Sequence, residues 1–267
     1  TIYGGAEVIA KRVAALTEDK FQIRIFGAGE LAPAFGTVDA VQQSAVECTH
    51  TAGYYFVGKN KAFAFDTTVP FGMNQRMQNA WKMRIAGLGG EVWARLGGIP
   101  QQIAGGDIYP ALERGVIDAA EWVGPYDDEK LGFYKVVSNY YYPGWWEACS
   151  MYSMYVNTKE WEKLPKVYQN ALEVACYEAN LDMMAEYDFK NPLALARLLK
   201  NGVKLHAYST QIMKEAQKQA FDLYEEEAGK NPAFKKIYEP WKKFRREQFQ
   251  WNRVAEHTLS NFMLNNM

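Results

Sequence analysis

Two successive stretches of the sequence share one order of elements, and this order limits the possible folds more than any other feature. The stretch 82–100 reads as a strand, a glycine turn, a helix and a glycine stop. The stretch 105–122 follows the same order, with Asp107 as the expected N-cap and Gly115 as the helix stop. Strands that alternate with short helices form α/β units around a mainly parallel sheet. The sequence therefore predicts an α/β fold.

The rest of the chain alternates between helical periodicity and strand-like patterns. Helices are expected at 6–16, 37–46, 73–81, 158–164, 165–200, 210–228 and 232–262. Further strands are expected at 21–26, 47–59, 62–72, 150–157 and 202–209. Thr37 is expected to cap its helix, and Pro192 is expected to kink the long helix that contains it.

Composition and charge exclude several classes of protein. The 30 basic and 31 acidic residues leave a net charge of −1, and no basic stripe suggests nucleic-acid binding. No apolar run reaches the roughly 18 residues that a membrane span needs. The first residue, Thr1, is not a methionine, which favours a processed chain. Cys48, Cys149 and Cys176 lack CxxC spacing, and buried free thiols are favoured over a metal site.

The turn at 86–90 contains three glycines, but it does not fit a dinucleotide-binding loop. The GxGxxG spacing fails because residue 92 is valine, so a tight strand–helix turn is the better interpretation. Just before this turn, Arg84 lies inside an expected strand. It either forms a salt bridge within the fold or grips a carboxylate with its guanidinium fork.

Glu121 and Glu147 each lie beside a tryptophan, and Glu121 lies at the inner end of an expected strand, where an unpaired charge is costly. Two such acids could act as an acid/base pair of the glycosidase type. They could also bind a hard cation such as Na⁺ or Ca²⁺, or be unrelated surface acids. No Ser-His-Asp order or HExxH motif accompanies them, so catalysis is the weaker functional reading. The aromatic stretch 139–146 resembles a pocket wall or an interlobe segment.

The last expected helix carries a strongly aromatic apolar stripe. The stripe consists of Ile237, Trp241, Phe244, Trp251, Ala255, Leu259 and Phe262. Such a face either packs on its own domain or forms a dimer surface.

The stretch 97–147, "GGIPQQIAGGDIYPALERGVIDAAEWVGPYDDEKLGFYKVVSNYYYPGWWE", closely resembles one family. That family is the extracytoplasmic solute receptors of tripartite ATP-independent periplasmic (TRAP) transporters, in the branch that binds 2-oxo and 2-hydroxy monocarboxylates. The stretches 50–81 and 82–97 resemble the same branch. The resemblance implies a two-lobed α/β fold with mixed sheets, a ligand in the interlobe cleft, and long hinge and C-terminal helices.

The resemblance also suggests how the chain is divided. Residues 1–81 would belong mainly to lobe 1, and 82–157 mainly to lobe 2 with crossing strands. Residues 158–207 would form the hinge helix and return to lobe 1, and 208–267 the C-terminal helices. Close relatives pair through a C-terminal helix exchanged between subunits, which favours a homodimer here.

The function implied by the resemblance is that of a periplasmic receptor, not an enzyme. It would bind pyruvate, 2-oxobutyrate or lactate with a bridging Na⁺ or Ca²⁺, and deliver it to the membrane permease subunits. The resemblance implies that Arg84 grips the ligand carboxylate. It also implies that the cation is held by Glu121, Trp122 and Glu147, and that the ligand is contacted by Glu121 and Trp122. Two alternatives remain: an enzyme that uses Glu121 and Glu147, and a dimeric interaction protein with a vestigial pocket.

The sequence departs from the family pattern in two places. The chain enters almost directly at the first helix, without the strand that usually precedes it. Between Trp81 and Lys82, a segment of the family has no counterpart, and that segment supplies a glutamine that binds ligand and cation. Loss of this segment would remove part of the first lobe, which favours the vestigial-pocket alternative.

Overall fold

The computed structural model describes residues 2–65, 69–74, 77, 88–103 and 105–266. The chain divides into two compact units, and each is built from three separate stretches. Unit 1 consists of Thr1–Ala52, Gln102–Tyr142 and Tyr152–Ala207. Unit 2 consists of Gly53–Gln101, Pro143–Met151 and Tyr208–Met267.

Unit 1 contains six α-helices and two short strand pairs among its described residues. The helices are α1 (Ile2–Leu16), α2 (Thr37–Gln42), α5 (Gly105–Glu113), α6 (Pro125–Leu131), α7 (Thr158–Lys163) and α8 (Lys166–Lys200). Strand β1 (Cys48–Ala52) pairs antiparallel with β3 (Tyr152–Val156). Strand β2 (Asn139–Tyr142) pairs parallel with β4 (Lys204–Ala207).

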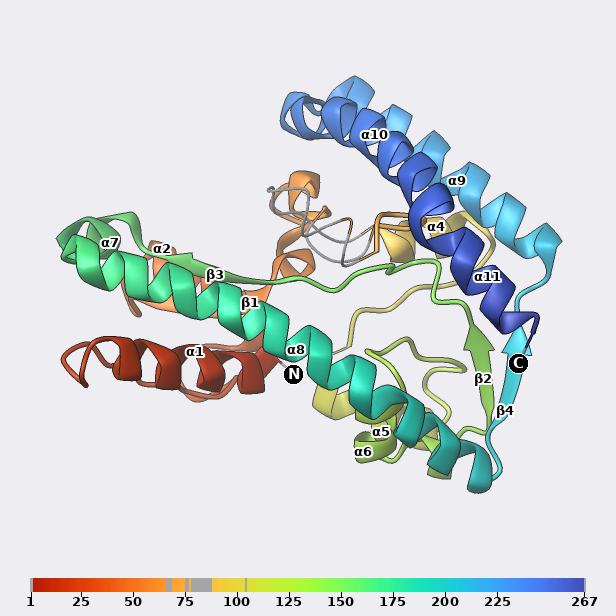
Figure 1. Ribbon diagram of the computed structural model, residues 1–267, viewed down its shortest axis with the longest axis horizontal. Coiled ribbons are helices and arrows are strands. Elements are labelled where there is room, and N and C mark those ends of the chain that lie inside the picture. Colours follow the sequence, from red (N-terminus) through yellow and green to blue (C-terminus); the bar gives the residue numbers. More distant parts are fainter. Residues whose placement is uncertain (1, 66–68, 75–76, 78–87, 104, 267) are drawn as a thin grey trace. The chain divides into compact units, whose positions relative to one another are not determined.

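The 35-residue helix α8 organises unit 1. One part of it packs against α1 and another part against α6, and Figure 1 shows it running past both helices. Against α1, the side chains of Ile9 and Val13 meet Leu172, Ala175 and Ala179 in one buried cluster. Small residues on α8 let the two helices approach closely. The helix continues through Pro192 to Lys200.

Unit 2 is built around a helical hairpin of α9 (Thr210–Lys230) and α10 (Pro232–Asn252). Ser209 caps α9 and Asn231 caps α10, because their side-chain oxygens accept the backbone N–H groups of Ile212 and Phe234. Pro232 suits the first turn of α10, which needs no N–H there. The described part of unit 2 also contains α4 (Gly89–Arg95), the π-helical segment Arg253–His257 and α11 (Thr258–Leu264).

The core of unit 2 is largely aromatic. One cluster joins five rings that are each exposed by 2% or less: Phe65, Tyr224, Phe234, Tyr238 and Trp241. Their ring centroids lie 4.6–6.4 Å apart, within the range of favourable tilted and edge-to-face pairs. The hydroxyl group of Tyr224 donates a hydrogen bond to the carbonyl of Pro70 at 2.8 Å, so this buried polar atom is satisfied.

Several expected elements differ from the structure. The segment 21–26 is not a strand, and neither is 118–122. A segment forms a strand only where a neighbouring strand supplies partners for its backbone hydrogen bonds. In the described part of the chain, neither segment has such a neighbouring strand. The described strands form one antiparallel pair and one separate parallel pair, so the expectation of a mainly parallel sheet is wrong for them.

Two expected helix caps are also wrong. Thr37 is the first residue of α2 and Gly36 occupies the cap position, because a 3₁₀ turn (Ala34–Gly36) leads directly into the helix. The same helix ends at Gln42 instead of Val46, since Ser44 has a left-handed φ of 59°. Asp107 lies inside the first turn of α5, which begins at Gly105.

Some expectations fall wholly or largely outside the described residues. They are the strand at 82–87, most of the helix at 73–81, and part of the strand at 62–72. Where that last segment is described, Lys61–Phe63 forms a 3₁₀ turn that Asn60 caps.

Candidate functional site

Glu121 lies on the connection between α5 and α6 in unit 1, and its side chain is exposed. The sequence had placed it at the inner end of a strand, where an unpaired carboxylate would be costly. Because this connection is neither a strand nor buried at Glu121, no such cost arises. Its carboxylate is accessible to a ligand or cation.

Trp122, the next residue, is half-buried and packs on a small cluster of its own unit. The cluster is formed by Ile108, Leu112 and Phe133. The indole ring also covers Gly105 at the start of α5, where an added Cβ would come within 2.5 Å of the ring atom Cη2. Only glycine fits beneath the ring, so α5 fixes the position of Trp122.

After Trp122 the chain turns sharply into α6. Gly124 has φ of 153°, a conformation that L side chains rarely adopt, and Pro125 follows it as the first residue of α6. The first turn of α6 then carries two buried acids, Asp127 and Asp128. The connection that bears Glu121 and Trp122 is therefore held at both ends by structured elements.

Glu147 lies in unit 2, in the short stretch Pro143–Met151. The Ser150 hydroxyl donates a hydrogen bond to its carboxylate. Burial raises the pKa of the Glu147 carboxyl to about 7, and the Ser150 hydrogen bond opposes that rise. In the described part of the chain, no lysine or arginine forms an ion pair with it. A cation would relieve this burial cost, so Glu147 fits a cation-binding role.

The aromatic residues before Glu147 belong in part to the core. Trp145 is only 4% exposed, and its ring stacks on Phe71 with centroids 5.5 Å apart and packs at a tilt against Trp93 at 5.0 Å. The main chain is tied as well, because the Phe71 N–H donates to the Trp145 carbonyl at 2.7 Å. Trp145 is therefore a packing residue, and the pocket-wall interpretation does not apply to it.

Of the predicted site residues, the structure describes three. Arg84 lies outside the described residues. Glu121 and Trp122 belong to unit 1, and Glu147 belongs to unit 2. Within the described ranges, no group of three or more His, Cys, Asp or Glu side chains could hold a metal ion on its own. A cation would thus need further oxygen ligands from main-chain carbonyls or from the solute itself.

The structure also identifies neighbours that the sequence did not single out: Gly105 under Trp122, and Ser150 on Glu147. For Gly105, the available sequence signal was the pair Gly105–Gly106 at an expected helix start. Cys149 is not a candidate nucleophile, because burial raises the pKa of its thiol to about 12.

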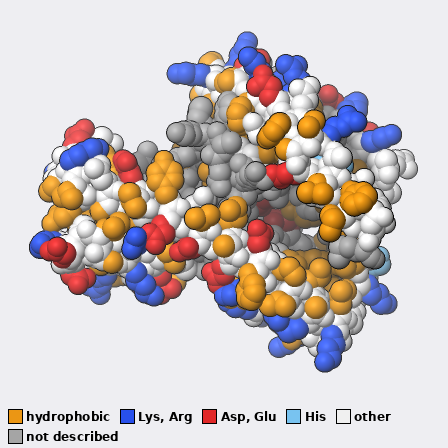
Figure 2. Space-filling view, in the orientation of Figure 1, with side chains coloured by type: hydrophobic (Ala, Val, Ile, Leu, Met, Phe, Trp, Pro, Cys, Tyr) orange, Lys and Arg blue, Asp and Glu red, His pale blue; other side chains and the backbone are white. Residues whose placement is uncertain are grey.

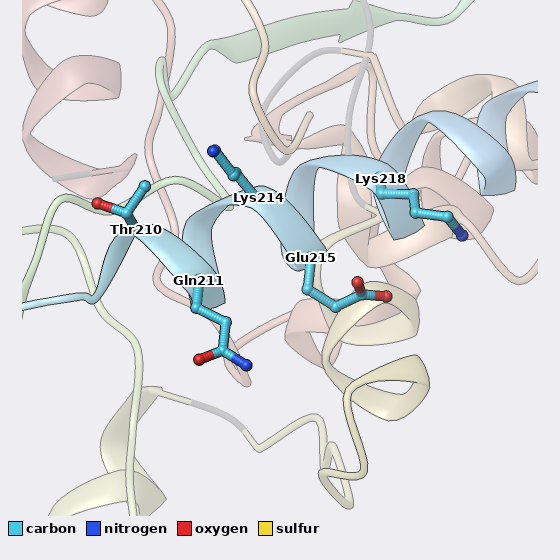
Figure 3. Close-up of a pocket in the computed structure, with 5 residues that line it drawn as sticks. All are labelled: Thr210, Gln211, Lys214, Glu215 and Lys218. Atoms are coloured by element: carbon cyan, nitrogen blue, oxygen red, sulfur yellow. The ribbon is translucent and has the colours of Figure 1, made fainter.

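A surface pocket in unit 2 is not a convincing second site. Figure 3 shows that all of its lining residues come from α9: Thr210, Gln211, Lys214, Glu215 and Lys218. All five side chains are exposed. Lys218 also pairs with Asp222 at 2.9 Å, so the pocket is a polar helix face in water.

The surface agrees with the charge balance of the sequence. Figure 2 shows basic and acidic side chains spread over the visible face without a continuous basic stripe. In the part of the chain that is described, no helix is both long and apolar enough to cross a membrane.

The chain is similar to known solute-binding proteins over nearly its whole length. The family model described as bacterial extracellular solute-binding protein, family 7, matches residues 1–84 and 77–231. A monocarboxylate 2-oxoacid-binding periplasmic protein of Nostoc sp. (strain PCC 7120) is 47% identical over 306 residues. That alignment covers 97% of this chain and 84% of the relative.

Solved structures give the same result. A TRAP transporter solute-binding protein from Bordetella bronchiseptica RB50, described as a mixed-occupancy dimer with copurified calcium and picolinate, is 43% identical with a TM-score of 0.95. The match covers 100% of this chain and 94% of that one. A Colwellia psychrerythraea protein with bound calcium and pyruvate is 30% identical, with a TM-score of 0.92 and coverage of 100% and 95%.

The comparisons also locate the departure from the family pattern. The two family-model matches overlap at residues 77–84, on either side of the junction between Trp81 and Lys82. The alignment with the Nostoc relative spans 306 residues, whereas this chain has 267. Residues of the relative therefore have no counterpart in this sequence.

Proposed function

The chain belongs to the family-7 bacterial extracellular solute-binding proteins, the periplasmic receptors of TRAP transporters, and we propose that it binds a small 2-oxo or 2-hydroxy carboxylate with a cation. The observation that carries this proposal is the 47% identity to a relative named for 2-oxoacid binding. Calcium with pyruvate and sodium with pyruvate in two structural neighbours support a cation beside the ligand.

Four residues are proposed to form the binding site. Arg84 would grip the ligand carboxylate through its guanidinium fork. Glu121, Trp122 and Glu147 would bind the cation, with Trp122 using its main-chain carbonyl, and Glu121 and Trp122 would also contact the ligand. The cation supplies the positive charge that lets two carboxylates and an anionic ligand share one place. The buried carboxyl of Glu147 supports this assignment.

The proposed role is capture and delivery without chemistry. The solute would pass to the membrane subunits of a TRAP permease, and no bond of the ligand would change. Pyruvate, 2-oxobutyrate and lactate share the α-oxygen and carboxylate that a cation and an arginine can bind together. An enzyme that uses Glu121 and Glu147 remains the alternative, and it predicts turnover.

The receptor is also proposed to form a homodimer through its C-terminal helices. The first three residues of the aromatic stripe pack within unit 2: Trp241 is buried, and Ile237 and Phe244 contact the same core. Beyond these residues, Trp251 is 63% exposed and Phe262 is 62% exposed. Large apolar side chains exposed in a row favour burial against a second copy. The dimer described for the Bordetella neighbour supports this.

Calorimetric titration of metal-stripped protein tests the proposed function. Pyruvate and lactate are each titrated with Na⁺ alone and then with added Ca²⁺. We expect binding only when a suitable cation is present. The Glu147→Gln variant should weaken cation and ligand binding together, whereas Glu239→Gln, an exposed glutamate of unit 2, should leave both unchanged.

Two results would contradict the proposal. The first is that no short carboxylate binds under any of these conditions. The second is turnover of a carboxylate or a sugar that Glu147→Gln abolishes while ligand binding persists, which would establish the enzyme alternative.

A further inference from the structure

We propose that Asn191 of helix α8 is a positioning residue for the connection that carries Glu121 and Trp122. The inference rests on the proposed function, because it assigns a role toward that binding site. Asn191 lies 65 residues beyond Tyr126 in the sequence, and its side chain accepts a hydrogen bond from the Tyr126 N–H. It acts through the start of α6, three residues beyond Trp122.

Helix α6 lacks a cap from its own cap residue. This helix has Gly124 at its cap position, and glycine has no side chain to accept a backbone N–H. Pro125 has no N–H, so Tyr126 carries the first free donor of the helix. That N–H donates to Oδ1 of Asn191 at 3.0 Å. Asn191 therefore performs the capping role from a different helix, which no local sequence pattern reveals.

Further polar contacts join helices α6 and α8. The Tyr187 hydroxyl, one turn before Asn191 on α8, donates to the buried carboxylate of Asp127. At the other end of α6, the guanidinium of Arg197 binds both oxygens of Glu129 at 2.7 Å. Contacts at the beginning and end of α6 prevent it from sliding or rotating on α8.

The link between helix α6 and the proposed cation-binding residues is short. Only Val123 and Gly124 separate Trp122 from Pro125. A chain extends at most about 3.6 Å per residue, so a shift of α6 is passed on to Trp122 and Glu121. At the other side, the indole of Trp122 sits against Gly105 of α5. The connection is thus held between two helices, and Asn191 secures the end nearer α6.

Two substitutions test this role against a matched control. Asn191→Ala removes the acceptor, and Asn191→Asp keeps an oxygen for the Tyr126 N–H. Asn170→Ala makes the same change at an exposed position of the same helix. Affinity for pyruvate in saturating Ca²⁺ is measured by calorimetry. Hydrogen–deuterium exchange of peptides that cover 118–126 is measured without ligand.

We expect Asn191→Ala to weaken pyruvate binding by about 10-fold, the effect usual for residues that orient metal ligands. Exchange in 118–126 should become faster in this variant and remain unchanged in Asn170→Ala. Asn191→Asp should recover most of the affinity, which a general loss of stability would not explain.

Unchanged exchange in Asn191→Ala would overturn the inference. Faster exchange with unchanged pyruvate affinity would also overturn it, since the connection would then be anchored without consequence for binding. If the unsubstituted protein binds no pyruvate with Na⁺ or Ca²⁺, the proposed function fails instead. The exchange data, which need no ligand, would then decide the anchoring separately.

Discussion

The two units differ in how some of their aromatic residues contribute. In unit 2, rings such as Trp241 and Phe65 are packed against one another and shielded from water. In unit 1, Tyr140 and Tyr187 present their hydroxyl groups to buried carboxylates of α6. Ring packing contributes through buried area, whereas a tyrosine–carboxylate pair contributes through one hydrogen bond and its charge. Unit 2 should therefore respond to lost volume, and unit 1 to a change of charge.

The acids of unit 1 illustrate the second case. Asp127 and Asp128 are 4% and 7% exposed, and one oxygen of Asp128 has no hydrogen-bond partner in the described structure. Burial raises the pKa of the Asp128 carboxyl to about 7, and the Tyr140 hydrogen bond opposes this rise. The same carboxylate helps to raise the pKa of the Tyr140 hydroxyl, together with burial.

The largest expected effect comes from removing a core ring of unit 2. Trp241→Ala should lower the free energy of unfolding by about 3–5 kcal/mol, because a fully buried indole leaves a cavity. Denaturant unfolding followed by circular dichroism measures the change. A loss below about 1 kcal/mol would mean that the aromatic cluster does not dominate the stability of unit 2.

A charge change in unit 1 should alter the pH dependence of stability. The pKa of Asp128 is about 7 in the folded chain, against 3.8 as its ordinary value. The contribution of the Asp128 carboxyl to the free energy of unfolding is thus fully present below pH 3.8. It is lost as pH rises to about 7, because only the unfolded state ionises in that range. The loss approaches about 1.4 kcal/mol per pH unit.

Asp128→Asn should remove this part of the pH dependence, and Asp182→Asn, an exposed site on α8, should not. Unfolding free energies at pH 5, 6 and 7 measure the difference. If the unfolding free energy falls with pH at the same rate in the Asp128→Asn variant and in the unsubstituted protein, the contrast between the two units is wrong.

A matched pair of glycines tests whether Trp122 is positioned by its packing contact with Gly105. Gly105→Ala places a methyl group 2.5 Å from the indole and should destabilise the protein by about 1–3 kcal/mol. Gly106→Ala meets nothing within 4 Å and should be neutral or slightly stabilising. Thermal unfolding and pyruvate titration of both variants measure the result. If both behave alike, Trp122 does not depend on Gly105.

The smallest effect on stability is expected at the exposed end of the aromatic stripe. Trp251→Ala should change the unfolding free energy of a monomer by less than about 0.5 kcal/mol, since the side chain is 63% exposed. Its effect should instead appear in sedimentation velocity, as a shift from dimer to monomer. A dimer that persists in Trp251→Ala would contradict the proposed surface. If Trp251→Ala has the small expected effect and Trp241→Ala the large one, burial and not residue type decides what a tryptophan contributes to the free energy of unfolding.

Most of the helices and three of the strands were predictable because local signals specify them, whereas helix α6 and strand β2 were not among the expected elements. Helices α8, α9 and α10 begin within about one residue of their expected starts, where proline, serine or asparagine provides a start signal. Strands β1, β3 and β4 lie inside their expected ranges. The two-lobed α/β fold itself is confirmed by solved relatives with TM-scores of 0.95 and 0.92.

Some of the failures depend on residues far away in the chain. Segments 21–26 and 118–122 were expected to be strands but have no partner strand in the described structure. The expected single helix 232–262 is interrupted by the π-helical segment Arg253–His257, which periodicity does not reveal. In the candidate site, Glu121, Trp122 and Glu147 were inferred from family resemblance, and the supporting Asn191 emerges only in three dimensions.

The trans-helix cap has a consequence for the order in which the protein becomes functional. Tyr126 cannot meet its acceptor until Asn191, 65 residues later, has been released from the ribosome or the export channel. Tyr187 and Arg197 follow their α6 partners by 60 and 68 residues. Contacts of such high sequence separation form late because a long loop must close first. The segment that carries Glu121 should therefore be anchored only after Asn191 has emerged, so a chain truncated before Asn191 would lack this anchor.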